Sequence, residues 1–276
     1  MEKIKSALAF LFLLPLLGCS QMVKADQMVH WMEVTESGGL YRCVLYSDDC
    51  AEVSAAESRE LEKACEKALE GISQAEALGL LDSVILPDSI GYPELLEIAE
   101  TIEEDDARMP NIHFYLSGGE SPKEILEKLS GEQGARCDIS RILFDNGGVV
   151  VPRLDGSGCL VCTQSGTTLL QGDNAQLAEL MAGQIHSLEL AELGFRAEWV
   201  TTGQEVAENG MLVQLDCIGC EVLGDKDKTA ADIARQLERI VQDTGPEPYL
   251  LEERSLQMAP ESRFKTDNFV CKVVIN

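Results

Sequence analysis

Cysteine is the residue type that offers the most chemistry in this sequence, and it occurs ten times in 276 residues. A thiol can carry a lipid, bind a metal, attack a substrate or form a disulfide. Cys19 directly follows an apolar run, and four other cysteines form two C-x-x-C pairs. The remaining five are spread along the chain, at positions 43, 50, 65, 137 and 271. Each of these three groups suggests a different chemistry.

Cys19 ends a segment that has the features of a lipoprotein signal peptide. Lys3 and Lys5 form a basic head, and residues 7–17 are an unbroken apolar run. Eleven helical residues at about 1.5 Å each cannot cross a hydrocarbon core of about 30 Å, so this run is a signal segment and not a membrane span. It leads into Leu16-Leu17-Gly18-Cys19, which resembles the lipobox of lipoprotein signal peptidase. We predict removal of residues 1–18 by cleavage between Gly18 and Cys19, with a diacylglyceryl group and its palmitate-type chains on Cys19.

One departure leaves an alternative open. Leu17 stands where a lipobox usually has a small residue, and Val23-Lys24-Ala25 is a loose site for ordinary signal cleavage after Ala25. No second apolar run of membrane length follows, so we expect residues 19–28 to be a lipidated tether. Two acyl chains anchor a protein stably, whereas one is marginal. The expected location is therefore the outer, extracytoplasmic face of a membrane, with lipid as the only anchor.

The two C-x-x-C pairs, Cys159 to Cys162 and Cys217 to Cys220, could belong to a zinc or redox site. A four-thiolate zinc site needs both sulfurs of a pair on a tight turn that faces the ion. Leu160 and Val161 favour a strand, in which residues three apart point to opposite faces. Gly219 makes the second pair more permissive. We expect mostly reduced, buried thiols and no metal, because nine cysteines cannot all pair and several stand where core residues belong.

Other candidate sites are weaker. The acidic run at 103–106 lacks the spacing of a calcium loop and suits a solvated helix end. His30, His113 and His186 stand in no H-x-x-H pattern, and Asp155-Gly-Ser-Gly158 leads into a strand, which makes it a hairpin loop. No catalytic motif follows a suitable strand. We therefore expect neither a cofactor nor an enzymatic activity.

The net charge of −26 restricts the partners. Nucleic acids require lysine and arginine for their phosphates, so nucleic acid is excluded as a partner. An anionic membrane surface would also repel the chain. Solubility alone also explains this charge.

Hydrophobic periodicity predicts an N-terminal α/β domain over residues 29–172. Capping boxes at Ser54-x-x-Glu57 and Ser121-Pro-x-Glu124, and Pro93 at a first helical position, predict three helices. Cys65 lies on the apolar face of the first helix and should be a core residue. The alternation of helices and strands implies a βαβ unit with parallel pairing. The predicted strands are 29–35, 41–46, 83–86, 111–116, 148–153, 159–164 and 167–170.

A smaller, strand-rich α+β domain is predicted over residues 173–276. We expect a helix over 175–185, and strands over 197–202 and 211–222 around the turn at Glu208-Asn209-Gly210. A helix beginning at Thr229-x-x-Asp232 and a strand over 269–275 complete it.

The order of these elements resembles the Ger(x)C family of spore-germination lipoproteins, in a divergent and shortened form. Four stretches carry the resemblance: the hairpin strand 39–45; 81–87 with the helix at 93–104 and Arg108 near its end; 111–126, with its Lys-Glu-Ile-Leu helix; and Val151-Pro-Arg153, the strand pair after it and 172–185. The match spans most of the chain and rests on order and spacing. The tryptophan-acidic motif that often follows the lipidated cysteine is missing, and the C-terminal domain is reduced.

The resemblance implies a non-enzymatic, lipid-anchored subunit of a nutrient germinant receptor. Its partners would be integral membrane subunits, and its place the outer face of the spore's inner membrane. Cys19 is the one functional position that carries over. A solute-binding or adaptor lipoprotein of another membrane complex is the alternative, and a lipid-anchored enzyme is a third hypothesis.

Overall fold

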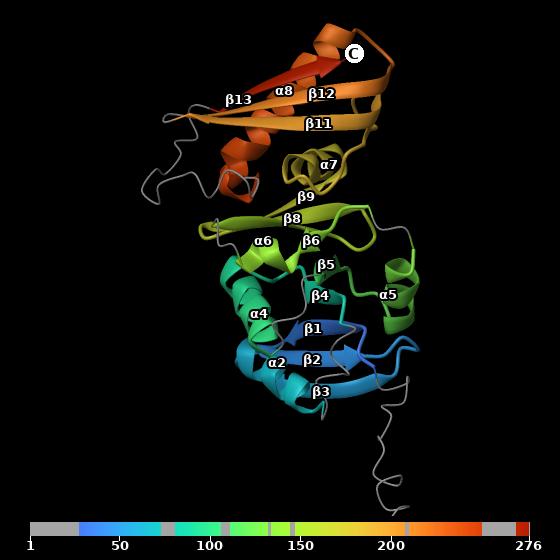
Figure 1. Ribbon diagram of the computed structural model, residues 1–276, viewed down its shortest axis with the longest axis vertical. Coiled ribbons are helices and arrows are strands. Elements are labelled where there is room, and N and C mark those ends of the chain that lie inside the picture. Colours follow the sequence, from blue (N-terminus) through green and yellow to red (C-terminus); the bar gives the residue numbers. More distant parts are fainter. Residues whose placement is uncertain are drawn as a thin grey trace, which may run out of the picture.

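The computed structural model describes residues 28–72, 81–105, 111–131, 134–143, 147–207, 210–249 and 269–275. Within these ranges the chain forms six α-helices and thirteen strands in three sheets, which confirms the predicted mixed α/β class. Figure 1 shows an elongated molecule in which a three-stranded sheet lies between a lower and an upper part. The signal peptide, Cys19 with nearly all of the tether, and Arg108 lie outside the described residues.

The lower part is built on a six-stranded sheet in the order β3-β2-β1-β4-β5-β6. β1 pairs with β4, and β4 with β5, in parallel, so the predicted βαβ arrangement is confirmed. β1, β2 and β3 form antiparallel pairs at one edge. The strands are β1 (Trp31–Ser37), β2 (Leu40–Tyr46), β3 (Glu52–Ser58), β4 (Ser83–Pro87), β5 (His113–Ser117) and β6 (Cys137–Asp138).

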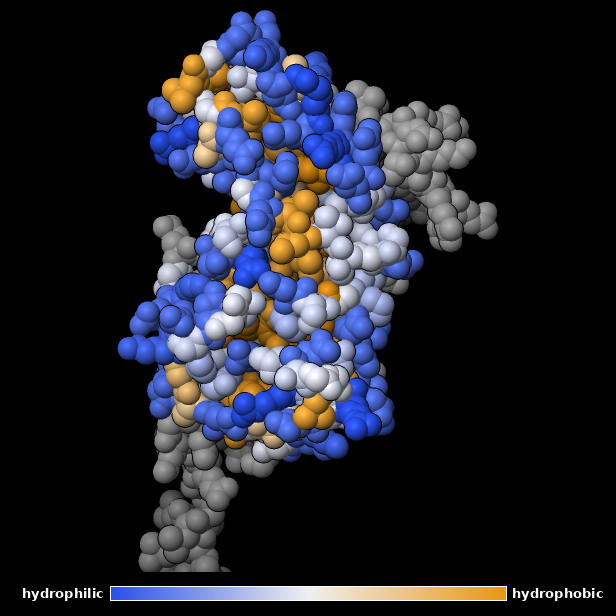
Figure 2. Space-filling view, turned by 180° about the vertical axis from the view of Figure 1, so that it is seen from behind, coloured by the Kyte–Doolittle hydropathy of each residue, from blue (hydrophilic) through white to orange (hydrophobic). Residues whose placement is uncertain are grey.

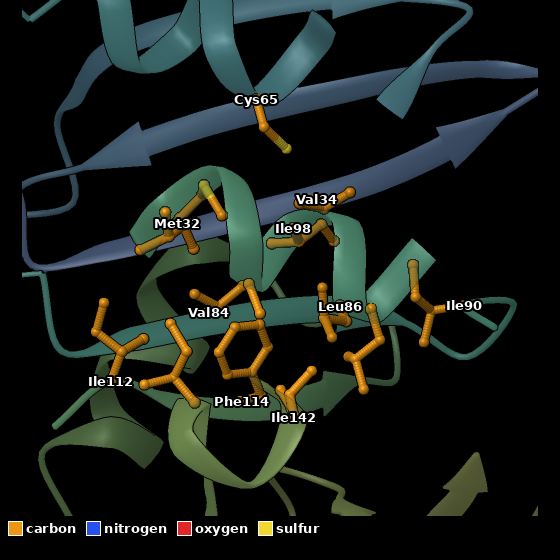
Figure 3. Packing of buried hydrophobic residues seen from close by; sticks show 14 of the residues in the cluster. Met32, Val34, Cys65, Val84, Leu86, Ile90, Ile98, Ile112, Phe114 and Ile142 are labelled. Atoms are coloured by element: carbon orange, nitrogen blue, oxygen red, sulfur yellow. The ribbon is translucent and has the colours of Figure 1, made fainter. Parts of the chain in front are cut away.

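Helices cover both faces of this sheet. α2 (Leu61–Glu70), α4 (Tyr92–Asp105) and α6 (Ile139–Leu143) contribute to the core on one face, and α5 (Pro122–Leu129) covers a smaller cluster on the other. Cys65 is fully buried, as predicted, and Figure 3 shows it pointing from its helix into the core above Met32 and Val34. In the smaller cluster Trp31 stacks on Tyr46, with 4.1 Å between the ring centroids.

The middle layer is the antiparallel sheet of β7 (Gly148–Pro152), β8 (Gly158–Thr163) and β9 (Gly166–Gln171). All residues of β7 and β8 are buried, because alternate side chains enter different cores. Val149, Val151 and Leu160 pack in the lower core, whereas Val150 and Val161 pack in the upper one. The two cores therefore meet at this sheet, and the predicted division at residue 172 follows its last strand and stays a prediction.

The upper part is a four-stranded sheet, in the order β10-β11-β12-β13, with two helices. β11 and β12 pair along their length as far as Ala207 and Gly210, whereas Glu208 and Asn209 of the predicted turn lie outside the described residues. β13 covers the predicted residues 269–275. Residues of both helices pack in the upper core. The elements are α7 (Gly172–Met181), β10 (Leu188–Leu190), β11 (Phe195–Ala207), β12 (Gly210–Val222), α8 (Lys226–Thr244), the 3₁₀ turn η2 (Glu247–Tyr249) and β13 (Phe269–Ile275).

Three predicted helix starts are wrong, and one of them is that of α7, which spans Gly172–Met181 rather than 175–185. Ser54 and Glu57 lie in β3, which pairs with β2, and the helix begins only at Leu61. Cross-strand pairing outweighs a local capping signal, which is worth about 1 kcal/mol. Helix α8 begins at Lys226 rather than at Thr229, because the side chain of Asp225 accepts a hydrogen bond from the backbone N–H of Lys228, 2.9 Å away.

Candidate functional site

A cleft of about 770 Å³ lies between the lower and upper parts, and we call it the waist cleft. Its lower wall consists of Lys128 at the end of α5 and of residues 152–156 in the β7–β8 hairpin. Its upper wall consists of α7, β10 with the loop before it, and residues 196–198 of β11. In Figure 2 the outline of the molecule is indented at this level. The volume is in the range of about 300–1,000 Å³ that is typical of small-molecule sites.

Arg153 organises the lower wall. The β7–β8 hairpin brings it beside the loops that follow β4 and β5, where the backbone N–H of Leu154 donates to the carbonyl of Leu116. The Arg153 guanidinium lies 2.6 Å from an oxygen of Asp88 and 3.7 Å from one of Asp155, and its side chain is only 13% exposed. Ser157 donates two hydrogen bonds to Asp155, which closes the hairpin loop as predicted. Arg153 is therefore already neutralised by carboxylates of its own chain.

Glu120 completes the lower wall's network from the loop between β5 and α5. Its carboxylate accepts hydrogen bonds from Lys128, from the hydroxyl of Ser117 and from the backbone N–H of Gly118. Burial by itself raises the pKa of Glu120, but these hydrogen bonds outweigh burial and lower the pKa to about 2. The predicted capping box of α5 follows, since the Glu124 carboxylate accepts from the backbone N–H and the hydroxyl of Ser121.

Helix α7 positions the upper wall. Gln176 bonds the backbone of β10 twice, because its amide donates to the carbonyl of Glu189 and accepts from the same residue's N–H, both at 3.0 Å. Gln184, just after the helix, donates to the carbonyl of Val150 in the middle sheet at 2.7 Å. These bonds hold α7 between β7 and β10. The helical turn between Gln176 and Gln184 then lies against the cleft.

Glu179 stands on that turn and differs from every other acid of the cleft. It is 8% exposed, and it lines the cavity. No hydrogen bond or ion pair reaches its carboxyl from the described residues, and burial alone raises its pKa to about 8. At neutral pH this carboxyl is mostly protonated. It can donate a hydrogen bond, or it can ionise if a bound cation compensates its charge.

The waist cleft thus offers binding groups of several kinds. Leu154, Ile185 and Leu188 supply apolar area, and Arg196 is exposed at the rim without an ion-pair partner among the described residues. The described lining includes neither histidine nor cysteine. The cleft can therefore bind a polar group of a ligand through the buried carboxyl of Glu179.

The two C-x-x-C pairs lie apart from this lining. Cys159 packs in the upper core and Cys162 in the lower one, so the expected splaying of the first pair across β8 is confirmed. Cys217 is buried in the upper core, and the half-buried Cys220 packs against the same core. Residues three apart in a regular strand would point to opposite faces, but Gly219, with φ of +66°, interrupts this alternation in β12. Burial raises the pKa of the Cys159, Cys162 and Cys217 thiols, which makes them poor nucleophiles and metal ligands at neutral pH. The side chain of Cys271 lies outside the description.

The histidines and the acidic run take ordinary structural places. His113 in β5 lies 2.7 Å from Asp138 of the neighbouring β6, and the histidine's hydrogen bond lowers the pKa of that carboxyl. His186 stacks on Trp199, with ring centroids 5.0 Å apart. Glu103 to Asp105 form the last turn of α4, which confirms the predicted helix end, and Asp106 lies outside the described residues. Among the residues that the structure describes, these groups do not form a common site.

The sequence reasoning did not identify Glu179. The visible signal was a single acidic residue among apolar ones in Leu177-Ala-Glu-Leu-Met181, in the second half of the helix. Such a position indicates burial, but it does not show whether a partner is present.

Comparison with known proteins adds no relative: no family model, no curated protein and no solved structure matches this chain.

Proposed function

We propose that this chain is a lipid-anchored, extracytoplasmic and non-enzymatic subunit of a membrane receptor complex, of the kind that the Ger(x)C lipoproteins form in spore germination. The observation that carries the proposal is the position of Cys19, directly after Leu16-Leu17-Gly18 and an apolar run too short to span a bilayer. The anchor would hold the folded ectodomain beside integral membrane subunits.

The order of elements supports this proposal. The four stretches that carry the family resemblance correspond to β2, to β4 with α4, to β5 with α5, and to β7–β9 with α7. Among the described residues, no helix is long and apolar enough to cross a membrane. The net charge of −26 would keep the ectodomain away from anionic lipid, and so leave its surface available to protein partners.

An exposed apolar pair on the upper sheet supports a role in assembly. Trp199 of β11 faces Ile218 of β12 across the strands, and each is more than half exposed. Their neighbours Val200 and Cys217 are buried in the upper core, so the pair lies on the opposite face of the sheet. Exposed tryptophan is enriched where proteins contact one another.

The anchor is tested by Cys19→Ala in the full-length chain. We expect loss of lipid labelling and release of a folded protein from the membrane fraction, whereas Cys50→Ala, at a half-buried cysteine far from the lipobox, should keep both the label and the membrane location. Retention of the label in Cys19→Ala, or a mature N-terminus after Ala25, would overturn the assignment.

The receptor role is tested by genetics. Multi-span membrane subunits encoded beside this chain, and a nutrient-specific germination defect after its deletion, are the expected results. An adjacent ATP-binding transporter cassette, together with spores that respond normally to every nutrient, would favour the alternative of a solute-binding or adaptor lipoprotein, which the waist cleft makes physically reasonable.

A further inference from the structure

The carboxyl of Glu179 has no hydrogen-bond or ion-pair partner within the ranges that the structure describes. A buried carboxyl without a hydrogen bond loses the solvation that it would have in water, which costs free energy. Glu179 nevertheless sits 8% exposed on α7, and it borders a cleft rather than a closed core. An arriving ligand can therefore reach it without disturbing the packing.

The charges around Glu179 favour a cation over an anion. From the lower wall, Lys128 is paired with Glu120, and Arg153 with Asp88 and Asp155. From the upper wall come the acids Glu189 and Glu198, and the unpaired Arg196. Behind the helix, the thiol of Cys159 is neutral because burial raises its pKa. When the charges that form ion pairs are set aside, two acids, Glu189 and Glu198, remain in the cleft against one base, Arg196.

The apolar lining restricts the cation further. Pro152, Leu154, Ile185 and Leu188 line the same cavity and would contact methylene groups. A hydrated inorganic cation would gain little from them, and this single carboxyl is far from the several oxygen ligands that calcium requires. An aliphatic amine combines both kinds of contact.

We propose that the waist cleft is a binding site for a small aliphatic amine, whose ammonium group pairs with Glu179 and whose carbon chain lies against Leu154, Ile185 and Leu188. Binding ionises Glu179, and its proton leaves to solvent as the ion pair forms. This inference does not depend on the lipid anchor or on the receptor partners. The amine site and the proposed receptor role can therefore be disproved separately.

The test is a calorimetric titration of the purified full-length protein with 1,5-diaminopentane, and with 1,5-pentanediol as its uncharged counterpart. Titrations at pH 7 in phosphate and in Tris, which differ in ionisation enthalpy, measure the protons released. We expect the diamine to bind with release of about one proton, because Glu179 is protonated before binding. The diol should bind at least about tenfold more weakly, because it cannot form the ion pair.

Matched variants separate the buried carboxyl from general attraction to an acidic protein. Glu179→Gln keeps the shape of the side chain, and it should lose the proton release and at least about tenfold in affinity. Glu66→Gln removes an exposed acid of α2, outside the cleft, and it should bind within about threefold of the parent.

Three results would overturn the proposal: no binding of the diamine at millimolar concentration, equal binding of the diol, or equal loss of affinity in the two variants. Infrared spectra give an independent measurement. The band of a protonated carboxyl should be present in the parent, absent in Glu179→Gln and removed by the diamine, and its persistence at saturation would contradict the ion pair.

Discussion

The two walls of the waist cleft hold their carboxyls in opposite ways. On the lower wall Glu120 accepts hydrogen bonds from Lys128, Ser117 and Gly118, and its pKa is lowered to about 2. On the upper wall Glu179 is more deeply enclosed, no partner from the described part of the chain reaches it, and burial raises its pKa to about 8. The same side chain therefore carries a full charge on one wall and almost none on the other at neutral pH.

This difference separates a group that stabilises the fold from one that is available for binding. The Glu120 network ties together the end of α5 and the loop after β5, and Arg153 ties the β7–β8 hairpin to Asp88. Saturated groups of this kind gain nothing from a ligand. Glu179 weakens the fold whenever it ionises, and a cation that pairs with it would remove that penalty.

The largest effect should come from Glu179→Gln. The folded pKa of about 8 exceeds the ordinary glutamate value of 4.5, so the folded state holds a proton that the unfolded state has lost between these two pH values. Stability therefore falls as pH rises through this window, by at most about 1.4 kcal/mol per pH unit. Between about pH 5 and pH 8 we expect the parent to lose about 3 kcal/mol relative to Glu179→Gln in urea unfolding.

The comparison with the variant isolates Glu179 from other acids. Burial also raises the pKa of Glu33, but that residue is present in both proteins and its contribution cancels in the difference. If the two stability curves run parallel from pH 5 to pH 8, Glu179 is not held neutral and the contrast between the walls fails.

A smaller loss should follow from breaking the lower wall with Arg153→Met. This change keeps most of the aliphatic volume but leaves Asp88 and Asp155 without their cation. We expect the free energy of unfolding to fall by about 2 kcal/mol at pH 7, because hydrogen bonds to a largely buried charge are lost. Arg235→Met, which breaks an exposed pair with Asp232 on α8, should change it by less than about 0.5 kcal/mol. Equal effects of the two changes would mean that the Arg153 network does not stabilise the hairpin.

The smallest effect should come from Glu120→Gln. Its lowered pKa gives stability that is fully present above the unfolded value of 4.5 and is lost as pH falls toward about 2. The variant should be less stable by about 1 kcal/mol at pH 7, and the difference should shrink below about pH 4. Glu127→Gln, in an exposed pair with Lys123, serves as the control and should stay within about 0.5 kcal/mol of the parent. If the difference in unfolding free energy between the parent and Glu120→Gln grew as the pH fell, the pKa of Glu120 would not be lowered in the fold.

Much of the fold could be predicted because its signals are local. The apolar face of α2 with Cys65, the strand before Pro87, the cap at Ser121 and the strand 269–275 all appear where periodicity and capping residues indicate them. The opposite orientations of Cys159 and Cys162 follow from the two-residue repeat of a strand. In these segments the same residues that favour the element also bury its apolar face.

The strands that were missed or predicted as helix lie where a distant partner decides. Residues 52–58 carry a helix-capping pattern, yet they form β3 because β2 offers an unpaired edge. The short β6 and β10, which the sequence reasoning missed, depend on pairing with β5 and β11. Elements of two or three residues have too little periodicity to be recognised before their neighbours are in place.

The sequence by itself determined the fold class, the opposite orientations of Cys159 and Cys162 on β8 and the strongly acidic character, since each depends on residue type and spacing along the chain. The lipobox-like stretch that ends at Cys19 is of the same local kind, and the lipidation that it predicts stays a prediction. Only the tertiary structure decided which acids are paired. Glu120 stands in a polar loop and Glu179 among apolar helix residues, but neither position shows whether a donor is near. In the fold, Glu120 lies within reach of Lys128 and Ser117, whereas no donor among the described residues reaches Glu179. The pKa of a carboxyl depends on solvent exclusion and on charges brought close by folding, and neither is encoded in the neighbouring residues.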